Sequence, residues 1–372
     1  MSVGRPTWAE VNLSAINRNV KALKSLIKTG VRFCAVVKAD GYGHGAEAVA
    51  AEALRAGADC LAVAILDEAL ALRAAGFTCP ILILGFTPPE QAFLVVKNSL
   101  SQTVYNMKQA QALSGAAAAT GRPALLHVKV DTGMGRLGLH PDCAADFALE
   151  ISRSPGLVLE GVYTHFAQAD SRDKTHTENQ FKDFSRALSS IEERGLRIPI
   201  KHCANSAALL DMPGTHLDMV RAGIALYGLW PSKETEHPVD LMPAMSFKST
   251  VAMLKNVPAE CEISYGSIYV TPAPATVATL AVGYADGWSR MMSGRAEVII
   301  RNKRVPVLGR ICMDQCMIDV TSVAGASEGD EVLLFGGPDL PAEEVADRLG
   351  TINYEIVCMV GKRVPRIYYL DS

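Results

Sequence analysis

The sequence has no run of roughly 18 or more consecutive apolar residues, so no segment predicts a membrane-spanning helix. It also lacks long runs of one charge sign, and its 36 basic and 39 acidic side chains give a formal net charge of −3. Proteins that bind nucleic acid or anionic membranes carry a basic patch, so we expect neither partner. The N-terminal residues lack the apolar core of a signal peptide, which favours a cytoplasmic protein.

The cysteines do not follow the pattern of a disulfide-stabilised secreted domain. There are nine, an odd number, and several lie inside apolar runs such as 31–39. Reduced, buried thiols are therefore expected. Cys312, Cys316 and Cys358 are potential metal ligands, but their spacing within strand-like segments favours buried thiols, and we predict no metal site.

What the sequence does contain is the pattern of an α/β protein. Hydrophobic residues make up 49% and charged residues 20% of the 372 residues, as in a folded globular chain. Eight repeats of a short apolar run, most of them followed by a helical segment, predict a TIM-like (β/α)8 barrel, with an open doubly wound sheet as the alternative. The predicted strands are 31–38, 60–65, 81–84, 101–105, 124–130, 159–165, 200–203 and 218–221.

After residue 231 the pattern changes. The polar segment 232–243 contains proline and is typical of a linker. Strand-like segments with little helix between them then predict a mainly antiparallel β-domain. We therefore predict a barrel domain over 1–231 and a β-strand domain over 232–372, with the first ten or so residues able to pack with the second domain. The predicted strands of the second domain are 247–254, 276–282, 296–300, 305–308, 317–320 and 331–335.

Polar residues stand at the carboxyl ends of the predicted barrel strands, where barrel enzymes carry their active sites. One polar strand end has an ordinary structural explanation, such as a solvated end or a hydrogen-bonded core residue. Five on one rim indicate a site that binds an anionic cofactor and moves protons. These strand ends are Lys38, Lys129 with Asp131, His165, Asn205 with Ser206, and Arg221.

Lys38 is the candidate nucleophile. An amine at the end of an apolar strand loses hydration, which favours its neutral form and its reaction with a carbonyl. The next loop contains Gly41, Gly43 and Gly45, which let the backbone approach a ligand closely. The loops after the seventh and eighth barrel strands often bind phosphate. A nucleophilic lysine facing a phosphate site suggests pyridoxal phosphate.

A series of motifs over essentially the whole chain resembles the alanine racemases. The lysine motif is V-K-A-D-G-Y-G-H-G at 37–45. In that family a (β/α)8 barrel is followed by a β-domain, in agreement with the pattern above. The other motifs are K-V-D-T-G-M-G-R at 129–136, T-H-F-A at 164–167, N-S at 205–206, V-R-A-G at 220–223, V-G-Y-A-D-G at 282–287, G-R-I-C-M-D at 309–314 and N-Y-E at 353–355.

The resemblance implies a racemase that interconverts L-alanine and D-alanine with pyridoxal phosphate and supplies D-alanine for peptidoglycan. Lys38 would form the aldimine with the cofactor and act as the base on one face of the substrate, and Tyr265 would act on the other. Inversion needs a proton to leave one face and return on the opposite face. The implied cofactor ligands are Lys38, Tyr42, His165, Ser206, Arg221, Gly223, Ile224 and Tyr354, with Arg221 at the pyridine nitrogen.

The resemblance also implies a head-to-tail homodimer whose active sites are shared. Tyr265, Tyr284 and Met313 of one subunit would complete the barrel site of the other. Arg136, Met313 and Tyr284 match residues around the substrate or its entrance. Lys129 matches a position that is carbamylated in many relatives, and Asn205 and Asp314 match supporting residues behind the site.

Several alternatives stay open at this point. Three other functions occur on a barrel of this type: a broad-specificity racemase acting on serine or larger amino acids, a decarboxylase, and a non-catalytic pyridoxal phosphate carrier. Such a carrier lacks the β-domain. The segment 133–138 matches the dinucleotide-binding pattern G-x-G-x-x-G. Its third glycine does not open a helix, so we do not predict a dinucleotide site.

Overall fold

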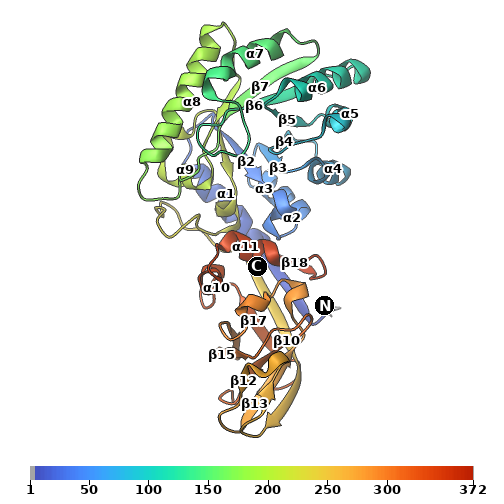
Figure 1. Cartoon of the computed structure of the whole chain (residues 1–372), viewed down its shortest axis with the longest axis vertical. Helices are drawn as coiled ribbons and strands as arrows, with labels where there is room; N and C mark the ends of the chain where they lie inside the picture. The colour runs from blue at the N-terminus through green and yellow to red at the C-terminus, as the bar shows by residue number, and fades with distance from the viewer. Residues whose placement is uncertain (1–4, 372) are drawn as a thin grey trace. The chain divides into compact units, whose positions relative to one another are not determined.

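A computed structural model describes residues 5–371, which form two compact units (Figure 1). The barrel unit comprises residues 15–41 and 46–242. The β-unit comprises the described residues up to Ser14, the short segment 42–45, and the described residues from Pro243 onward. The segment 232–242 therefore groups with the barrel, and the segment 42–45 groups with the β-unit although barrel residues flank it on both sides.

The barrel unit contains one parallel sheet of eight strands in the order β8-β7-β6-β5-β4-β3-β2-β9. Backbone hydrogen bonds from Asp218 N to Lys201 O and from Arg221 N to Ala204 O, both 3.0 Å, join the two end strands. The closed (β/α)8 barrel is thus confirmed, and the open sheet is excluded. The strands are β2 (Arg32–Val36), β3 (Cys60–Val63), β4 (Ile81–Ile83), β5 (Ser101–Val104), β6 (Ala124–Lys129), β7 (Leu157–Tyr163), β8 (Ile200–His202) and β9 (Met219–Ala222).

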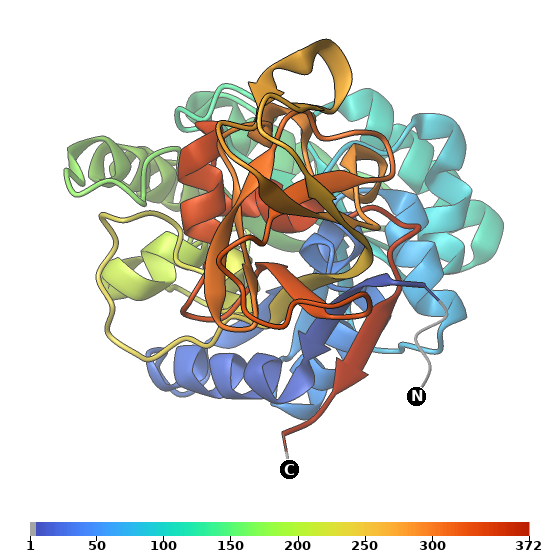
Figure 2. The same cartoon turned by 90° about the horizontal axis from the view of Figure 1, so that it is seen from below.

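Helices lie around the outside of this sheet (Figures 1 and 2). Their ends follow ordinary capping chemistry. Asn106 accepts a hydrogen bond from Gln109 N at the start of α6, and Gly121 ends that helix at φ +67°. The helices are α1 (Leu13–Ser25), α3 (Ala46–Arg55), α4 (Leu66–Ala74), α5 (Ala92–Lys97), α6 (Met107–Thr120), α7 (Ala144–Arg153), α8 (Thr175–Glu193) and α9 (Ser206–Asp211). The segment labelled α2 (Lys38–Tyr42) is not a regular helix but a left-handed turn.

The β-unit contains a second eight-stranded sheet in the order β13-β16-β15-β14-β17-β10-β1-β18, and β13 also pairs with β10. Its pairs are antiparallel except β1 with β18, which lie side by side and parallel (Figure 2). The prediction of a mainly antiparallel β-domain is confirmed. The strands are β1 (Thr7–Asn12), β10 (Met245–Val257), β13 (Ala275–Leu280), β14 (Glu297–Ile300), β15 (Lys303–Leu308), β16 (Cys316–Asp319), β17 (Glu331–Phe335) and β18 (Arg366–Tyr369).

Smaller elements complete the β-unit. A short hairpin consists of β11 (Glu262–Ile263) and β12 (Tyr269–Val270), and two helices, α10 (Ala342–Leu349) and α11 (Asn353–Met359), precede β18. The hairpin packs on a hydrophobic cluster that includes Ile263 and Leu308. This packing ties the hairpin to the strand that precedes the 309–314 motif.

The nine cysteines are free thiols. Cys34, Cys60, Cys203 and Cys316 are buried, as expected. The prediction is wrong for Cys143 and for Cys358 on α11, which are exposed, and Cys79, Cys261 and Cys312 are only partly buried. Among the described residues, no group of three or more His, Cys, Asp or Glu side chains is arranged to hold a metal ion. Within the same residues, no helix is long and apolar enough to cross a membrane.

Candidate active site

The predicted site residues of the barrel unit stand at the carboxyl ends of five strands that are consecutive around the barrel. These strands are β6, β7, β8, β9 and β2, in that order. Because parallel strands end at the same rim, the side chains that follow them share one region of the barrel. The residues are Lys129 with Arg136, His165, Asn205 with Ser206, Arg221 with Gly223 and Ile224, and Lys38.

Lys38 begins a left-handed turn directly after β2. Ala39 and Asp40 both have φ +52°, a conformation that costs roughly 1–3 kcal/mol for a residue other than glycine. Three hydrogen bonds hold the turn: Gly41 N donates to Val37 O (2.9 Å), Ala39 N to Glu68 Oε1 (2.6 Å), and Ala46 N to Asp40 Oδ1 (2.9 Å). The turn ends the strand abruptly and leaves Lys38 half-buried at the rim.

Arg221 is a buried cation on β9, with 3% of the residue exposed. Its Nη1 donates to His202 Nδ1 (2.8 Å), and its Nη2 donates to Thr164 O (3.0 Å), Cys203 O (3.1 Å) and His165 Nδ1 (3.2 Å). Burial, together with the charge of Arg221, holds the pKa of His165 well below its usual value. His165 is therefore neutral and accepts a hydrogen bond through Nδ1.

Two further side chains, Tyr163 and His202, pack beneath Arg221. Their rings are stacked, with centroids 4.7 Å apart, and the two residues are partners in the β7–β8 register. Lys129 Nζ and Arg221 Cζ lie 5.0 and 5.2 Å from the centroid of Tyr163. Tyr163 and His202 were not among the predicted site residues, although a polar ring inside an otherwise apolar strand was a signal that could have identified them.

Lys129 is buried on β6, and its ammonium group has a lowered pKa. Burial, and then the charges of Arg221 and Arg136, outweigh the opposing effect of Asp131 and lower the pKa of Lys129 to about 7. Asp131 in turn accepts hydrogen bonds from Gly133 N, Met134 N and Gly135 N and so organises the loop that carries Arg136. A substantial fraction of Lys129 is a neutral amine at neutral pH.

Ser206 forms a small set of polar donors with the chain that follows β9. Its Oγ accepts hydrogen bonds from Gly223 N (2.8 Å) and Ala225 N (3.4 Å), which leaves its own hydroxyl proton available for a ligand. Asn205 caps α9 by accepting from Ala208 N (3.0 Å). Hydroxyl and backbone N–H donors at such helix starts are suited to an anion.

In the β-unit, Tyr42 and Tyr354 lie close together. Their ring centroids are 6.2 Å apart. Burial, and then the proximity of Cys358, raise the pKa of Tyr42, so its hydroxyl keeps its proton and can donate it in a hydrogen bond. Gly43 allows this approach, because a Cβ at that position would lie 2.2 Å from Val357 O on α11.

A second group in the β-unit contains Tyr265, Tyr284 and Met313, with 71%, 41% and 53% of each residue exposed. Their loops are joined by backbone hydrogen bonds from Tyr284 N to Cys312 O and from Ala285 N to Met313 O, both 3.0 Å. Ser264 Oγ also donates to Arg310 O (2.6 Å), which links the turn of Tyr265 to the same loop. Three large side chains from separate segments therefore share an exposed face.

Asp314 supports that loop. Arg363 Nη2 donates to the Asp314 carboxylate (2.6 Å), and Arg363 Nε donates to the buried carboxylate of Asp286 (2.7 Å). Asp286 follows Tyr284 by two residues, and it also accepts from Gly283 N (3.0 Å). Arg363 thus joins the loop of Met313 to the turn of Tyr284.

The fold and these residues define a two-unit barrel protein with a strand-end lysine, a buried arginine and a serine hydroxyl suited to an anion on one rim. Models of the alanine racemase N-terminal domain and C-terminal domain match residues 11–231 and 244–368. The chain belongs to the alanine racemase family.

Two sequence relatives and two solved structures illustrate how complete the similarity is. The chain is 56% identical to the alanine racemase of Desulfovibrio desulfuricans over 99% of both chains, and 51% identical to that of Desulfosudis oleivorans over 97% of this chain and 96% of the relative. It is 41% identical to the solved alanine racemase of Clostridium difficile, with a TM-score of 0.96 over 100% and 97% of the chains. The Bacillus anthracis enzyme with bound L-Ala-P gives 41% identity and a TM-score of 0.94 over 99% and 96%.

Proposed function

We propose that this protein is an alanine racemase, an isomerase that interconverts L-alanine and D-alanine. The observation that carries the proposal is that the full chain matches proteins of that name at up to 56% identity while Lys38, Arg221 and Ser206 share one rim of the barrel. The β-unit distinguishes the chain from a barrel-only carrier of the cofactor.

The rim supports pyridoxal phosphate as the cofactor. Ser206 would hold the phosphate through its hydroxyl and Ile224 through its backbone N–H, while Gly223, whose N–H donates to Ser206 Oγ, would orient that hydroxyl at the phosphate. Tyr42 and Tyr354 would add phenolic hydroxyls. Arg221 would face the pyridine nitrogen. Its buried guanidinium can only donate hydrogen bonds, and an unprotonated pyridine nitrogen can accept one. When bound, pyridoxal phosphate supplies an electrophilic carbon for an amine and a ring that stabilises negative charge at the substrate α-carbon.

The protein residues then move the proton. Lys38 Nζ would hold and return the α-proton on one face, and the Tyr265 hydroxyl would do the same on the other. Arg136 and the loop of Met313 would bind and orient the substrate carboxylate. An arginine at the ring nitrogen does not readily give up a proton, so it would limit the charge that the ring withdraws and disfavour side reactions.

The exposure of Tyr265, Tyr284 and Met313 supports a site shared between two copies of the chain. Large side chains grouped on one surface are typical of residues that another molecule covers. In a head-to-tail homodimer each copy would supply Tyr265 to the barrel of its partner. A separated subunit would then lack its second base.

Lys129 should be modified by carbon dioxide in a pH-dependent manner. Its neutral amine adds to CO2 and releases a proton, which produces a carbamate that can accept a hydrogen bond from Arg136. Because the pKa of Lys129 is about 7, the neutral fraction rises as the pH increases through 7 and falls below it. 13C NMR with labelled bicarbonate should therefore show one protein carbamate signal that grows between about pH 6 and pH 8.

The Lys129→Arg variant provides the control for that signal, since arginine retains a cation but forms no carbamate under these conditions. A carbamate signal that persists in Lys129→Arg would assign the modification to another lysine. A wild-type protein without any such signal at pH 8 would contradict the prediction.

The proposed function is tested by incubating the protein with pyridoxal phosphate and L-alanine in D2O while chirality and α-deuteration are followed together. D-Alanine that carries deuterium at the α-carbon is the expected product. L-Serine assayed in parallel distinguishes a broad-specificity racemase. If the cofactor binds and no amino acid is inverted, the racemase proposal fails and a carrier role gains support.

A further inference from the structure

A chain of hydrogen bonds runs from Arg221 through the interior of the barrel. Arg221 Nη1 lies 2.8 Å from His202 Nδ1, and His202 Nε2 lies 2.8 Å from His127 Nδ1. His127 Nε2 in turn lies 3.1 Å from a carboxylate oxygen of Glu160. The four side chains come from β9, β8, β6 and β7, so the chain crosses strands that are neighbours in the sheet.

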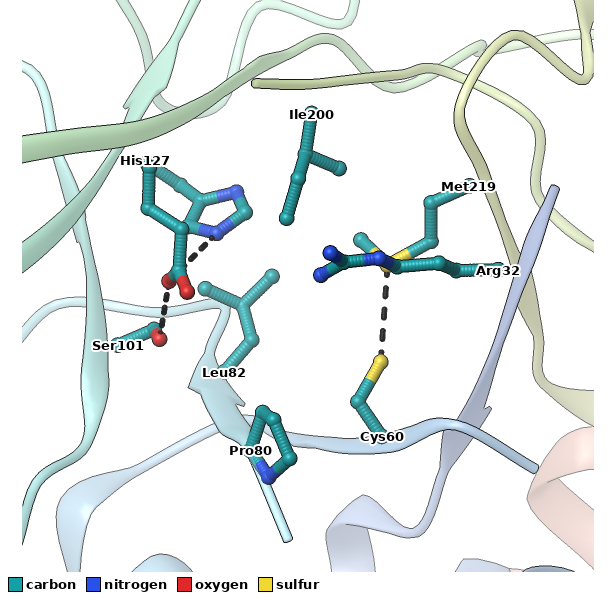
Figure 3. A pocket seen from close by; sticks show the side chains of 9 residues that line it. Arg32, Cys60, Pro80, Leu82, Ser101, His127, Ile200 and Met219 are labelled. Carbon is teal, nitrogen blue, oxygen red and sulfur yellow. Dashed lines mark hydrogen bonds and ion pairs between the residues drawn. The ribbon is translucent and has the colours of Figure 1, made fainter. Parts of the chain in front are cut away.

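The hydrogen-bond chain ends in a small pocket at the amino-terminal end of the barrel. Glu160 and His127 line this pocket together with Arg32, Ser101 and Met219, which are the first residues of β2, β5 and β9. Figure 3 shows His127 and Ser101 on one side of the pocket and Arg32 on the other. The pocket lies at the opposite end of the strands from Lys38, and nothing in the proposed reaction uses it directly.

The chemistry of the groups gives the chain a single direction. A guanidinium only donates, so His202 Nδ1 must accept and the proton of that ring must sit on Nε2. His202 Nε2 then donates to His127 Nδ1, which places the proton of His127 on Nε2. That N–H donates to the Glu160 carboxylate, which also accepts from Ser101 Oγ.

The charge states agree with this direction. Burial, and then Arg221, His127 and Lys129, hold the pKa of His202 well below its usual value. Burial alone would raise the pKa of Glu160, but the hydrogen bonds from His127 and Ser101 and the charge of Arg32 lower it overall. The hydrogen-bond chain therefore joins the buried cation of Arg221 to the carboxylate of Glu160, which is ionised at neutral pH. The other partners of Arg221 are two backbone carbonyls and the neutral ring of His165.

The backbone makes room for this arrangement. Gly161 pairs with His127 in the β6–β7 register, and the register shifts immediately before it. A Cβ on Gly161 would lie 2.4 Å from His127 Nδ1, closer than any side chain tolerates. A glycine at this place in β7 thus leaves the space that the His127 ring occupies.

We propose that Glu160 and His127 are positioning residues that hold Arg221, through His202, in one orientation at the cofactor site. Glu160 acts as the terminal acceptor. If Glu160 does not accept from His127 Nε2, His127 can carry its proton on Nδ1 instead. His202 then has to move its own proton to Nδ1, where this N–H opposes the N–H of Arg221 and the hydrogen bond between the two residues is lost. The inference rests on the proposed function only in that Arg221 faces the cofactor ring; the hydrogen-bond chain itself belongs to the cofactor-free protein.

The first test is therefore made without cofactor. In protein labelled with 15N-histidine, two-bond 1H–15N correlations should show His127 and His202 as Nε2–H tautomers, as the hydrogen-bond geometry requires. Glu160→Gln should keep both patterns because its amide oxygen still accepts, whereas Glu160→Leu should lose the single tautomer of His127 and shift the signals of His202. Ser101→Ala is the matched control, since it removes the second hydrogen bond to Glu160 and leaves the chain intact.

The second test adds pyridoxal phosphate. The loss of one hydrogen bond predicts about two- to tenfold weaker cofactor binding in Glu160→Leu, together with a lower kcat at unchanged KM for alanine. Glu160→Gln should keep the cofactor affinity and kcat near the wild-type values. A Glu160→Leu protein with wild-type tautomers and cofactor affinity would overturn the proposal, even if its melting temperature fell, and so would a Glu160→Gln protein that behaves like Glu160→Leu.

The two proposals fail in different ways. If wild-type protein neither binds pyridoxal phosphate nor racemises alanine, the proposed function fails. The tautomer measurement then still tests the hydrogen-bond chain. If wild type is an active racemase and the tautomers do not respond to Glu160→Leu, only the positioning role is lost.

Discussion

Replacement of Lys38 by alanine should reduce alanine racemisation at least about a thousandfold, which is within the range expected when a positioned proton-transfer group is lost. The variant should also lose the visible absorbance that pyridoxal phosphate acquires when a lysine amine binds it covalently. The side chain is half-buried at the end of β2, and hydrogen bonds of the neighbouring backbone hold the turn, so the fold should remain intact. Steady-state kinetics, absorbance spectra and circular dichroism provide the measurements.

Lys108→Ala is a suitable control for this experiment, because Lys108 is an exposed lysine on α6. It should retain wild-type activity and absorbance. A Lys38→Ala protein that keeps more than about a hundredth of wild-type turnover would rule out Lys38 as the base, since general acid–base groups contribute at least about 100-fold.

Replacement of Tyr265 by phenylalanine should separate the two directions of the reaction. Removal of its hydroxyl is expected to slow proton abstraction from L-alanine by about 100- to 10,000-fold, while abstraction from D-alanine by Lys38 is affected far less. With 71% of the residue exposed, the change should alter the free energy of unfolding by no more than about 0.5 kcal/mol. Exchange of the α-proton of each enantiomer in D2O measures the two steps independently.

Tyr269→Phe serves as the control, because Tyr269 lies on the same hairpin in β12 and packs on the cluster beneath it. It should leave both exchange rates unchanged. Equal residual exchange from L-alanine and D-alanine in Tyr265→Phe would argue against one base on each face.

The same two variants test whether the site is shared. In a head-to-tail dimer of one Lys38→Ala and one Tyr265→Phe subunit, one of the two sites contains an intact lysine and an intact tyrosine. Random mixing makes half of the dimers mixed, so about a quarter of wild-type activity should return. If Tyr265 served its own subunit, the mixture would stay inactive.

The barrel was predictable because its strands are short apolar runs separated by helical segments, and several of them end in a polar residue. Lys38 and Arg221 could be named as strand ends from this apolar pattern alone. The strand β1 was not among the predicted strands. Its pairing with β10 and β18 depends on residues more than 200 positions away, and no local pattern specifies such a partner.

The assignment of the segment 42–45 to the β-unit was equally hidden. Tyr42 follows Lys38 by four residues, yet it groups with the β-unit and approaches Tyr354. The left-handed turn at Ala39 and Asp40 makes this possible. Three glycines in the motif indicated a tight loop, but its direction depends on hydrogen bonds with Glu68 and Ala46 from other elements.

By itself, the sequence determined the class of fold and the chemical types on the rim, because hydrophobic periodicity and strand-end polarity are local properties of the chain. The tertiary structure alone decided which buried polar groups meet. His127, His202 and Glu160 look like isolated polar residues in apolar strands, and only the register of β6, β7 and β8, with Gly161 opposite His127, aligns them beneath Arg221. Register depends on pairing between distant segments, so the direction of the hydrogen bonds beneath the site could be known only from the folded barrel.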